Sequence, residues 1–265
     1  MNDLESNAKF FFIKGEEDFL NGKYQDCIRN LIYAQEMFTS MGNKEQSAES
    51  LFMIANAYYS IDQLSQARQI YSQAFSRFKE LTKLDRIGEC SYKLGEIYRT
   101  EGNFKKSKQY LAEAIEAFTK MSNIEKLADT WKELGVAYQT SLNEGSANPN
   151  HSINAYKTAI SYYKKLKVIN KLAETQYDLG QLLLSESKLN DALKVLSEAL
   201  NYFTKQKDDD NIITLFILIG RAYFNMGKKP KARDYMYKAV EHMRQAEYSP
   251  EKIGEIKKSI FAMLG

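Results

Sequence analysis

Apolar positions recur three and four residues apart along almost the whole chain, which is the spacing of amphipathic α-helices. Short polar turns, such as residues 101–103 and 226–228, separate the helical segments and join them in pairs. Only three prolines occur among 265 residues, so few positions would interrupt a helix. The pattern predicts an all-α chain built from helical hairpins.

Two coupled ladders of small residues fix the register of these hairpins. A glycine or alanine recurs at intervals of 40 residues, with one interval of 45 between the fourth and fifth copies. These residues are Gly15, Ala55, Gly95, Gly135, Gly180 and Gly220. An alanine follows each of them after 19 residues, or after 24 residues in the fourth copy. Because one insertion shifts both ladders together, they indicate six repeats of one unit.

A single hairpin of this kind cannot bury its apolar face alone, so neighbouring repeats must stack into a continuous core. We therefore predict one domain over residues 1–265, a right-handed α-solenoid of six helical hairpins followed by a C-terminal capping helix. The expected repeats cover about residues 4–42, 43–82, 83–122, 123–167, 168–207 and 208–247, and the capping helix covers residues 250–264.

The end of the chain indicates how the stack closes. Ser249 and Pro250 are the residue types of an N-cap and a first helical turn. The apolar stripe of the capping helix would consist of Ile253, Ile256, Ile260 and Phe261. The first helix of repeat six is apolar nearly all round over residues 212–219, which indicates burial on more than one side. We expect the capping helix to cover it; the alternative is an exposed patch for a homodimer or a partner.

The repeated unit resembles the tetratricopeptide repeat (TPR) family, whose pattern is a large residue, Leu-Gly, Tyr, a turn Gly and two alanines. The fourth copy matches this pattern with Trp131, Leu134, Gly135 and Tyr138. The 40-residue spacing is similar to the long-helix variety found in soluble NSF attachment proteins, Leu-Gly-Asn-repeat adaptors and Rap-type regulators. Residues 48–59 look most like Rap-type chains, which also carry an N-terminal effector domain that we do not expect here.

The resemblance implies that the first helix of each hairpin lines a concave groove. Six residues before the small residue it places an acidic row in repeats two to five, and neighbouring positions hold aromatic, amide and charged residues. The candidate groove residues are Glu49, Phe52, Asn56, Tyr59, Glu89, Tyr92, Glu96, Arg99, Asp129, Lys132, Gln139, Glu174, Tyr177, Gln181 and Arg221. Such a groove would suit an extended or helical protein segment with basic residues beside apolar anchors.

Two other interpretations of these residues stay open. Acidic residues near a helix start also complement the helix dipole, and aromatic residues on such helices also belong to the core between repeats. The insertion in repeat four gives residues 140–151 the composition of a loop. This loop would either contact a partner or be a tolerated surface insertion.

Charge and composition exclude several classes of function. The 37 basic and 34 acidic residues give a net charge of +3 without a basic block, so nucleic acid is not an expected partner. There is no signal-peptide pattern and no apolar stretch long enough to cross a bilayer, so we expect a cytoplasmic chain without membrane insertion. We expect Cys27 and Cys90 to be reduced, and His151 and His242 to be solvated.

The sequence has no phosphate-binding loop, nucleophile elbow or set of metal ligands, so we expect neither a catalytic site nor a cofactor or metal. The leading hypothesis is an adaptor that holds a peptide or a partner helix in its groove. The alternatives are a peptide-responsive regulator of Rap type without the effector domain, and a scaffold that associates with itself through the apolar end around Ile217.

Overall fold

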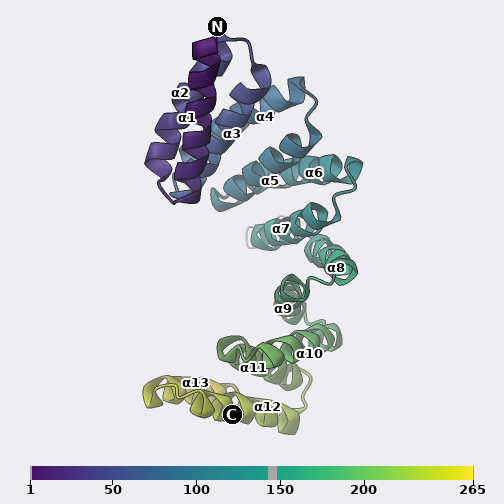
Figure 1. Cartoon of the computed structure of the whole chain (residues 1–265). Helices are drawn as coiled ribbons and strands as arrows, with labels where there is room; N and C mark the ends of the chain where they lie inside the picture. The colour runs from purple at the N-terminus through teal and green to yellow at the C-terminus, as the bar shows by residue number, and fades with distance from the viewer. Residues whose placement is uncertain (1, 143–147, 265) are drawn as a thin grey trace. The chain divides into compact units, whose positions relative to one another are not determined.

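The computed structural model describes the backbone of residues 2–142 and 148–264, and the side chains of residues 3–142 and 148–258. Within these ranges the chain forms thirteen α-helices and no strand (Figure 1). The helices are α1 (Asn2–Leu20), α2 (Tyr24–Ser40), α3 (Lys44–Ser60), α4 (Leu64–Glu80), α5 (Leu84–Thr100), α6 (Phe104–Lys120), α7 (Ile124–Leu142), α8 (Pro149–Leu166), α9 (Ile169–Ser185), α10 (Leu189–Gln206), α11 (Asp209–Asn225), α12 (Lys229–Gln245) and α13 (Pro250–Leu264). The prediction of an all-α, TPR-like solenoid with a C-terminal capping helix is confirmed.

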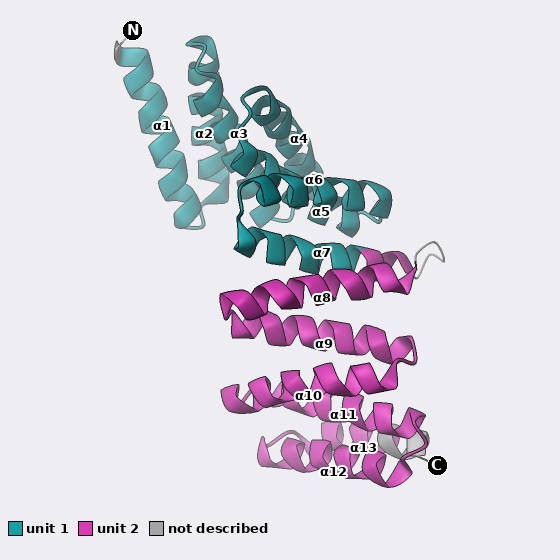
Figure 2. Ribbon diagram, turned by 90° about the vertical axis from the view of Figure 1, so that its right-hand side faces the viewer, with its two compact units in different colours: residues 1–137 teal, residues 138–265 magenta. Residues whose placement is uncertain are grey.

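The chain divides into two compact units, Met1–Ala137 and Tyr138–Gly265, which are called unit 1 and unit 2 below (Figure 2). In unit 1, each helix from α1 to α5 packs against the helix that follows it. In unit 2, the same sequential packing runs from α8 to α13. Such packing buries the apolar face of each hairpin against its neighbours, as a repeat array requires.

The small residues of the ladder lie where the two helices of one hairpin approach closely. A Cβ atom on Gly95 would lie 2.6 Å from Leu111 Cγ, and one on Gly180 would lie 2.6 Å from Leu196 Cγ. Both distances are far shorter than ordinary carbon–carbon contact. Glycine at these positions therefore lets a leucine of the second helix pack directly on the backbone of the first.

The turns between helices contain residues with left-handed backbone conformation. Gly42 in the turn after repeat one has a φ of 71°. Thr82 occupies the equivalent position after repeat two and has a φ of 53°. Glycine adopts this conformation without a steric penalty, whereas a β-branched residue does not. The turn after repeat two is therefore more strained than the turn after repeat one.

The N-terminal end of the array has a partly polar outer face. Phe10 on α1 is 60% exposed, whereas Cys90 and Thr130, at the same position of later repeats, are fully buried at 0%. Lys14 and Glu17 on the same helix are exposed, although their later counterparts are apolar and buried. The face of α1 that corresponds to an inter-repeat surface is thus mixed, with charged side chains beside the exposed apolar side chains of Phe10 and Ile13.

At the C-terminal end, α13 covers the last hairpin. Ile253 and Ile256 pack against Met236 and Val240 of α12, as does Ile217 of α11. The apolar first helix of repeat six is therefore largely buried, as expected, and Ile217 is itself partly buried. The other expected stripe residues, at 260 and 261, lie outside the described side chains.

Candidate functional site

Unit 1 contains a cavity of about 400 Å³ that is open to solvent between the first helices of its repeats. Helices α3, α5 and α7 provide most of its lining, and α6 contributes one ring. The lining residues are Phe52, Asn56, Arg86, Glu89, Tyr92, Lys93, Phe118, Lys126 and Asp129. Five of these are candidate groove residues from the sequence, namely Phe52, Asn56, Glu89, Tyr92 and Asp129.

The acidic row beside the cavity is neutralised by basic side chains that the sequence analysis did not single out. Arg86 Nε donates a hydrogen bond to Glu49 Oε1 of the preceding repeat at 2.9 Å, and its Nη1 donates to Glu89 Oε2 at 2.6 Å. Lys126 Nζ lies 3.3 Å from Glu89 Oε1, again one repeat back. Glu49 and Glu89 of the acidic row are therefore paired with basic side chains, and charges of both signs alternate along the first helices of unit 1.

Arg86 also contacts the apolar core. Its guanidinium carbon lies 4.8 Å from the centre of the Phe52 ring. Burial alone would lower the pKa of Arg86, but its hydrogen bonds and the charges of Glu49 and Glu89 outweigh burial, so this pKa lies above its ordinary value. Phe52 itself is only 8% exposed and packs with Tyr71, so it belongs mainly to the core, although it also lines the cavity.

A second cluster adjoins the cavity at Lys93. Its Nζ lies 2.8 Å from Glu96 Oε2 and 4.3 Å from the centre of the Tyr59 ring. Tyr59 donates a 3.4 Å hydrogen bond to Glu96 Oε2. Burial, together with the negative charge of Glu96, raises the pKa of Tyr59 to about 12. The phenol is therefore a hydrogen-bond donor at neutral pH and not a base.

Arg99, another candidate residue, pairs with a carboxylate of the next repeat. Its Nε donates to Glu133 Oε1 on α7. Burial raises the pKa of Glu133 above its ordinary value, although the hydrogen bond with Arg99 acts in the opposite direction. Lys132 beside it is partly buried and does not line the cavity.

Asn56 is fixed by a residue behind the cavity wall. Tyr71 on α4 is fully buried and donates its hydroxyl hydrogen to Asn56 Oδ1. This bond uses an acceptor position of the amide oxygen and fixes its orientation, so the amide group of Asn56 is presented to the cavity in one orientation.

Unit 2 has a smaller cavity, of about 280 Å³, between α9 and α11. Its lining residues are Gln181, Leu184, Ser185, Leu218, Arg221 and Asn225. Gln181 and Arg221 are candidate residues, and Arg221 has no ion-pair partner among the residues that the structure describes. Three other candidates, Gln139, Glu174 and Tyr177, do not line this cavity.

These three residues have other surroundings in unit 2. Gln139 accepts a 2.7 Å hydrogen bond from the Tyr156 hydroxyl group. Burial raises the pKa of Tyr177 above its ordinary value, although a hydrogen bond with Gln181 lowers it. Glu174 is exposed. Residues 143–147 of the expected loop lie outside the described residues.

The histidines and cysteines are placed as follows. His151 is exposed, but the expectation of a solvated His242 is wrong, because its Nε2 lies 2.8 Å from Asp209 Oδ1. Burial, with the charge of Asp18, raises the pKa of Cys27 to about 12, and burial also raises the pKa of Cys90. Both thiols are therefore protonated at neutral pH, which makes them poor nucleophiles.

The described side chains form neither a metal-ligand cluster nor a membrane-spanning segment. Within the described part of the chain, no group of three or more His, Cys, Asp or Glu side chains could hold a metal ion. No helix formed by the described residues has the length and apolar character needed to span a membrane.

Comparison with known proteins identifies related sequences and folds. The family model described as soluble NSF attachment protein, SNAP, matches residues 3–110 and 82–246. Comparison with curated proteins gives no significant match. Among solved structures, a signal transduction ATPase with numerous domains and a TPR sensor, from Pyrococcus horikoshii, aligns with 97% of this chain and 39% of its own, at 14% identity and a TM-score of 0.78.

Two other solved structures align over nearly their full length. The apo form of RapI aligns with 97% of this chain and 96% of its own, at 15% identity and a TM-score of 0.70. BtubC from P. vanneervenii aligns with 93% of this chain and 94% of its own, at 19% identity and a TM-score of 0.66. At these identities the likeness concerns the fold.

Proposed function

The chain belongs to the soluble NSF attachment protein family, and from that premise we propose that it is a cytoplasmic, non-enzymatic protein-interaction module. Its cavity in unit 1 holds a peptide or a helix of a partner protein. The observation that carries this proposal is the convergence of three first helices, α3, α5 and α7, on one open cavity of about 400 Å³ lined by aromatic and charged side chains. A cavity of this kind suits an anchor side chain with polar contacts around it.

The alternating charges define the chemistry of the partner segment. Arg86, Lys93 and Lys126 face Glu89 and Asp129 in the cavity lining. A segment with only basic side chains would meet three cations and two anions there. The partner we propose therefore carries an apolar or aromatic anchor for the ring of Tyr92, flanked by both acidic and basic side chains. Complementary charges on its flanks would select the register and speed association.

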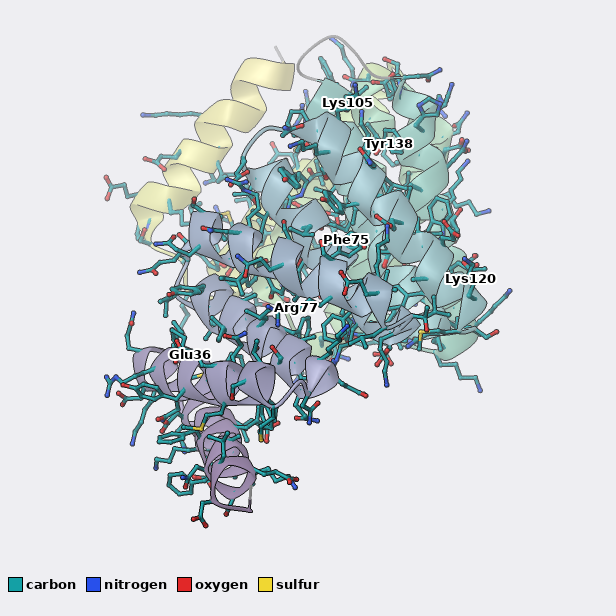
Figure 3. All side chains as sticks on the ribbon, turned by 90° about the horizontal axis from the view of Figure 1, so that it is seen from above. Glu36, Phe75, Arg77, Lys105, Lys120 and Tyr138 are labelled. Atoms are coloured by element: carbon teal, nitrogen blue, oxygen red, sulfur yellow. The ribbon has the colours of Figure 1, made fainter. Side chains whose placement is uncertain are left out.

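A site-specific crosslinking experiment tests where a partner binds. A photoreactive phenylalanine analogue replaces Lys126, which is exposed and lines the cavity, or Lys105, which is exposed on α6 and does not line it (Figure 3). After illumination in an extract of the source cells, mass spectrometry identifies the attached proteins. We expect one set of partners to be attached at position 126 and absent at position 105.

Two controls accompany the experiment. The Tyr92→Ala variant removes an aromatic surface from the cavity and should reduce attachment at position 126. Circular dichroism checks that this variant remains helical. Equal attachment at positions 126 and 105, or attachment that does not respond to Tyr92→Ala in a folded variant, would contradict the proposed site.

A further inference from the structure

The junction between repeats one and two breaks the apolar pattern of the array at three positions. Gln35 on α2, Ser47 on α3 and Arg77 on α4 occupy these positions. One repeat further along, the same three positions hold Phe75, Ile87 and Ala117, which are buried members of one hydrophobic cluster. Local departures from an otherwise consistent pattern are typical of functional sites.

The three polar residues meet in space together with Thr39. Gln35 Nε2 donates to Thr39 Oγ1 at 2.9 Å and to Ser47 Oγ at 3.2 Å, and the two hydroxyl oxygens are 2.7 Å apart. Arg77 Nη1 also donates to Ser47 Oγ. Ser47 is only 1% exposed, so the group is anchored below the surface.

Arg77 differs from the other arginines of unit 1 in its charge pairing. Arg29, Arg68, Arg86 and Arg99 each form an ion pair with a carboxylate. Within the described residues, Arg77 has a serine hydroxyl as its hydrogen-bond partner and no carboxylate. A guanidinium group has five N–H donors, so most of the donors of Arg77 are available to a ligand.

These donors border a cavity of about 250 Å³. Besides Arg77 and Ser47, it is lined by Thr39, Gly42, Lys44, Glu80 and Leu81. Two basic residues and one acidic residue give the lining a net positive charge. Pockets for drug-sized ligands have volumes of roughly 300–1,000 Å³, so this cavity suits a smaller molecule.

We infer that this cavity binds a small oxyanion, either a phosphate-like group or a carboxylate. Arg77 provides the paired N–H donors that match the geometry of such groups. The exposed hydroxyl group of Thr39 supplies a short-range contact, Ser47 holds Arg77 and Thr39 in place beneath it, and Lys44 adds positive charge at the rim. The site lies apart from the cavity of the proposed partner, since the two linings share no residue.

Isothermal titration calorimetry with inorganic phosphate and with succinate, at constant ionic strength, tests this inference and separates the two ligand chemistries. We expect saturable binding of at least one anion to the wild-type chain. The Arg77→Met variant should bind it at least tenfold more weakly. The matched control is Arg29→Met, which removes an exposed arginine from the same unit and should leave the affinity unchanged.

A triple variant, Gln35→Phe, Ser47→Ile and Arg77→Ala, separates anion binding from folding. It transplants the apolar residues of the next junction, so it should remain folded and unfold at an equal or higher temperature, yet bind no anion. Absence of anion binding by the wild-type chain would overturn the inference. Equal anion affinities of the wild-type chain and Arg77→Met would overturn it as well.

Discussion

In unit 1 the cavity arginine, Arg86, is held by two carboxylates, whereas in unit 2 Arg221 has no ion-pair partner among the described residues. Residues 1–137 contain 20 acidic and 18 basic residues, and residues 138–265 contain 14 acidic and 19 basic residues. Unit 1 is therefore the more acidic unit, yet the carboxylates beside its cavity are paired with basic side chains. The comparison shows that the charge at such a surface depends on pairing between successive repeats and not on the charges of one row.

The largest expected effect comes from a substitution that breaks this pairing, which is present at the cavity arginine of unit 1 but not at that of unit 2. Arg86→Met should lower the free energy of unfolding by about 1–3 kcal/mol, because Glu49 and Glu89 lose a donor in a partly buried environment. Arg221→Met should change it by less than about 0.5 kcal/mol, since no ion pair is lost. Urea denaturation measures both values. Equal losses in the two variants would remove the distinction between the cavities.

A smaller effect concerns pH and Glu133, whose counterpart in the unit 2 cavity is the uncharged Leu218. The pKa of Glu133 in the folded chain is raised above its ordinary value of 4.5. Between these two values the folded state binds more protons than the unfolded state, so stability falls as pH rises. One such group contributes at most about 1.4 kcal/mol per pH unit.

Glu133→Gln should remove this decrease in stability between pH 4.5 and the raised pKa, as measured by urea denaturation at several pH values. Glu116→Gln is the matched control on α6, because Lys120 lowers the pKa of Glu116. Glu116 contributes a rise in stability with pH between its lowered pKa and 4.5, and the control variant should remove that rise. A pH profile unchanged by Glu133→Gln would contradict the assigned role of burial.

The smallest effect compares two turns. Thr82→Gly in unit 1 should stabilise the chain by about 0.5–1 kcal/mol, because a β-branched residue has a φ of 53° there. Lys207→Gly in unit 2 relieves a φ of 57° at an unbranched residue and should stabilise less. Thermal unfolding of the two variants measures the difference. Destabilisation by Thr82→Gly would show that glycine's greater freedom in the unfolded chain outweighs the relief of strain.

The ladders of small residues predicted the helical hairpins well because a fixed period reflects a fixed packing geometry. Gly95 and Gly180 were identifiable as contact points for this reason. Five cavity residues were also among the candidates, because the resemblance to the TPR family implies that first helices line a groove. The register of the repeats then gave their residue numbers.

The electrostatic partners could not be predicted in the same way. The ion pair of Arg86 with Glu49 joins residues 37 positions apart in the sequence. Which residues meet at such a separation depends on how neighbouring hairpins are offset along their axes. One signal was available: nine residues before each small residue, repeats three, four and five hold Arg86, Lys126 and Lys171. This basic row runs beside the acidic one. The polar junction at Ser47 and Arg77 had a comparable signal in its departure from the apolar pattern.

The affinity of the crosslinked partner for two charge-reversal variants tests the central claim most directly. Lys126→Glu reverses an exposed charge at the unit 1 cavity, where its ion pair contributes little to stability, and Arg221→Glu reverses a charge at the unit 2 cavity. Calorimetric titration should show affinity at least tenfold weaker for Lys126→Glu and unchanged for Arg221→Glu. Unchanged affinity for Lys126→Glu, or a loss confined to Arg221→Glu, would contradict the assignment of the partner site to unit 1.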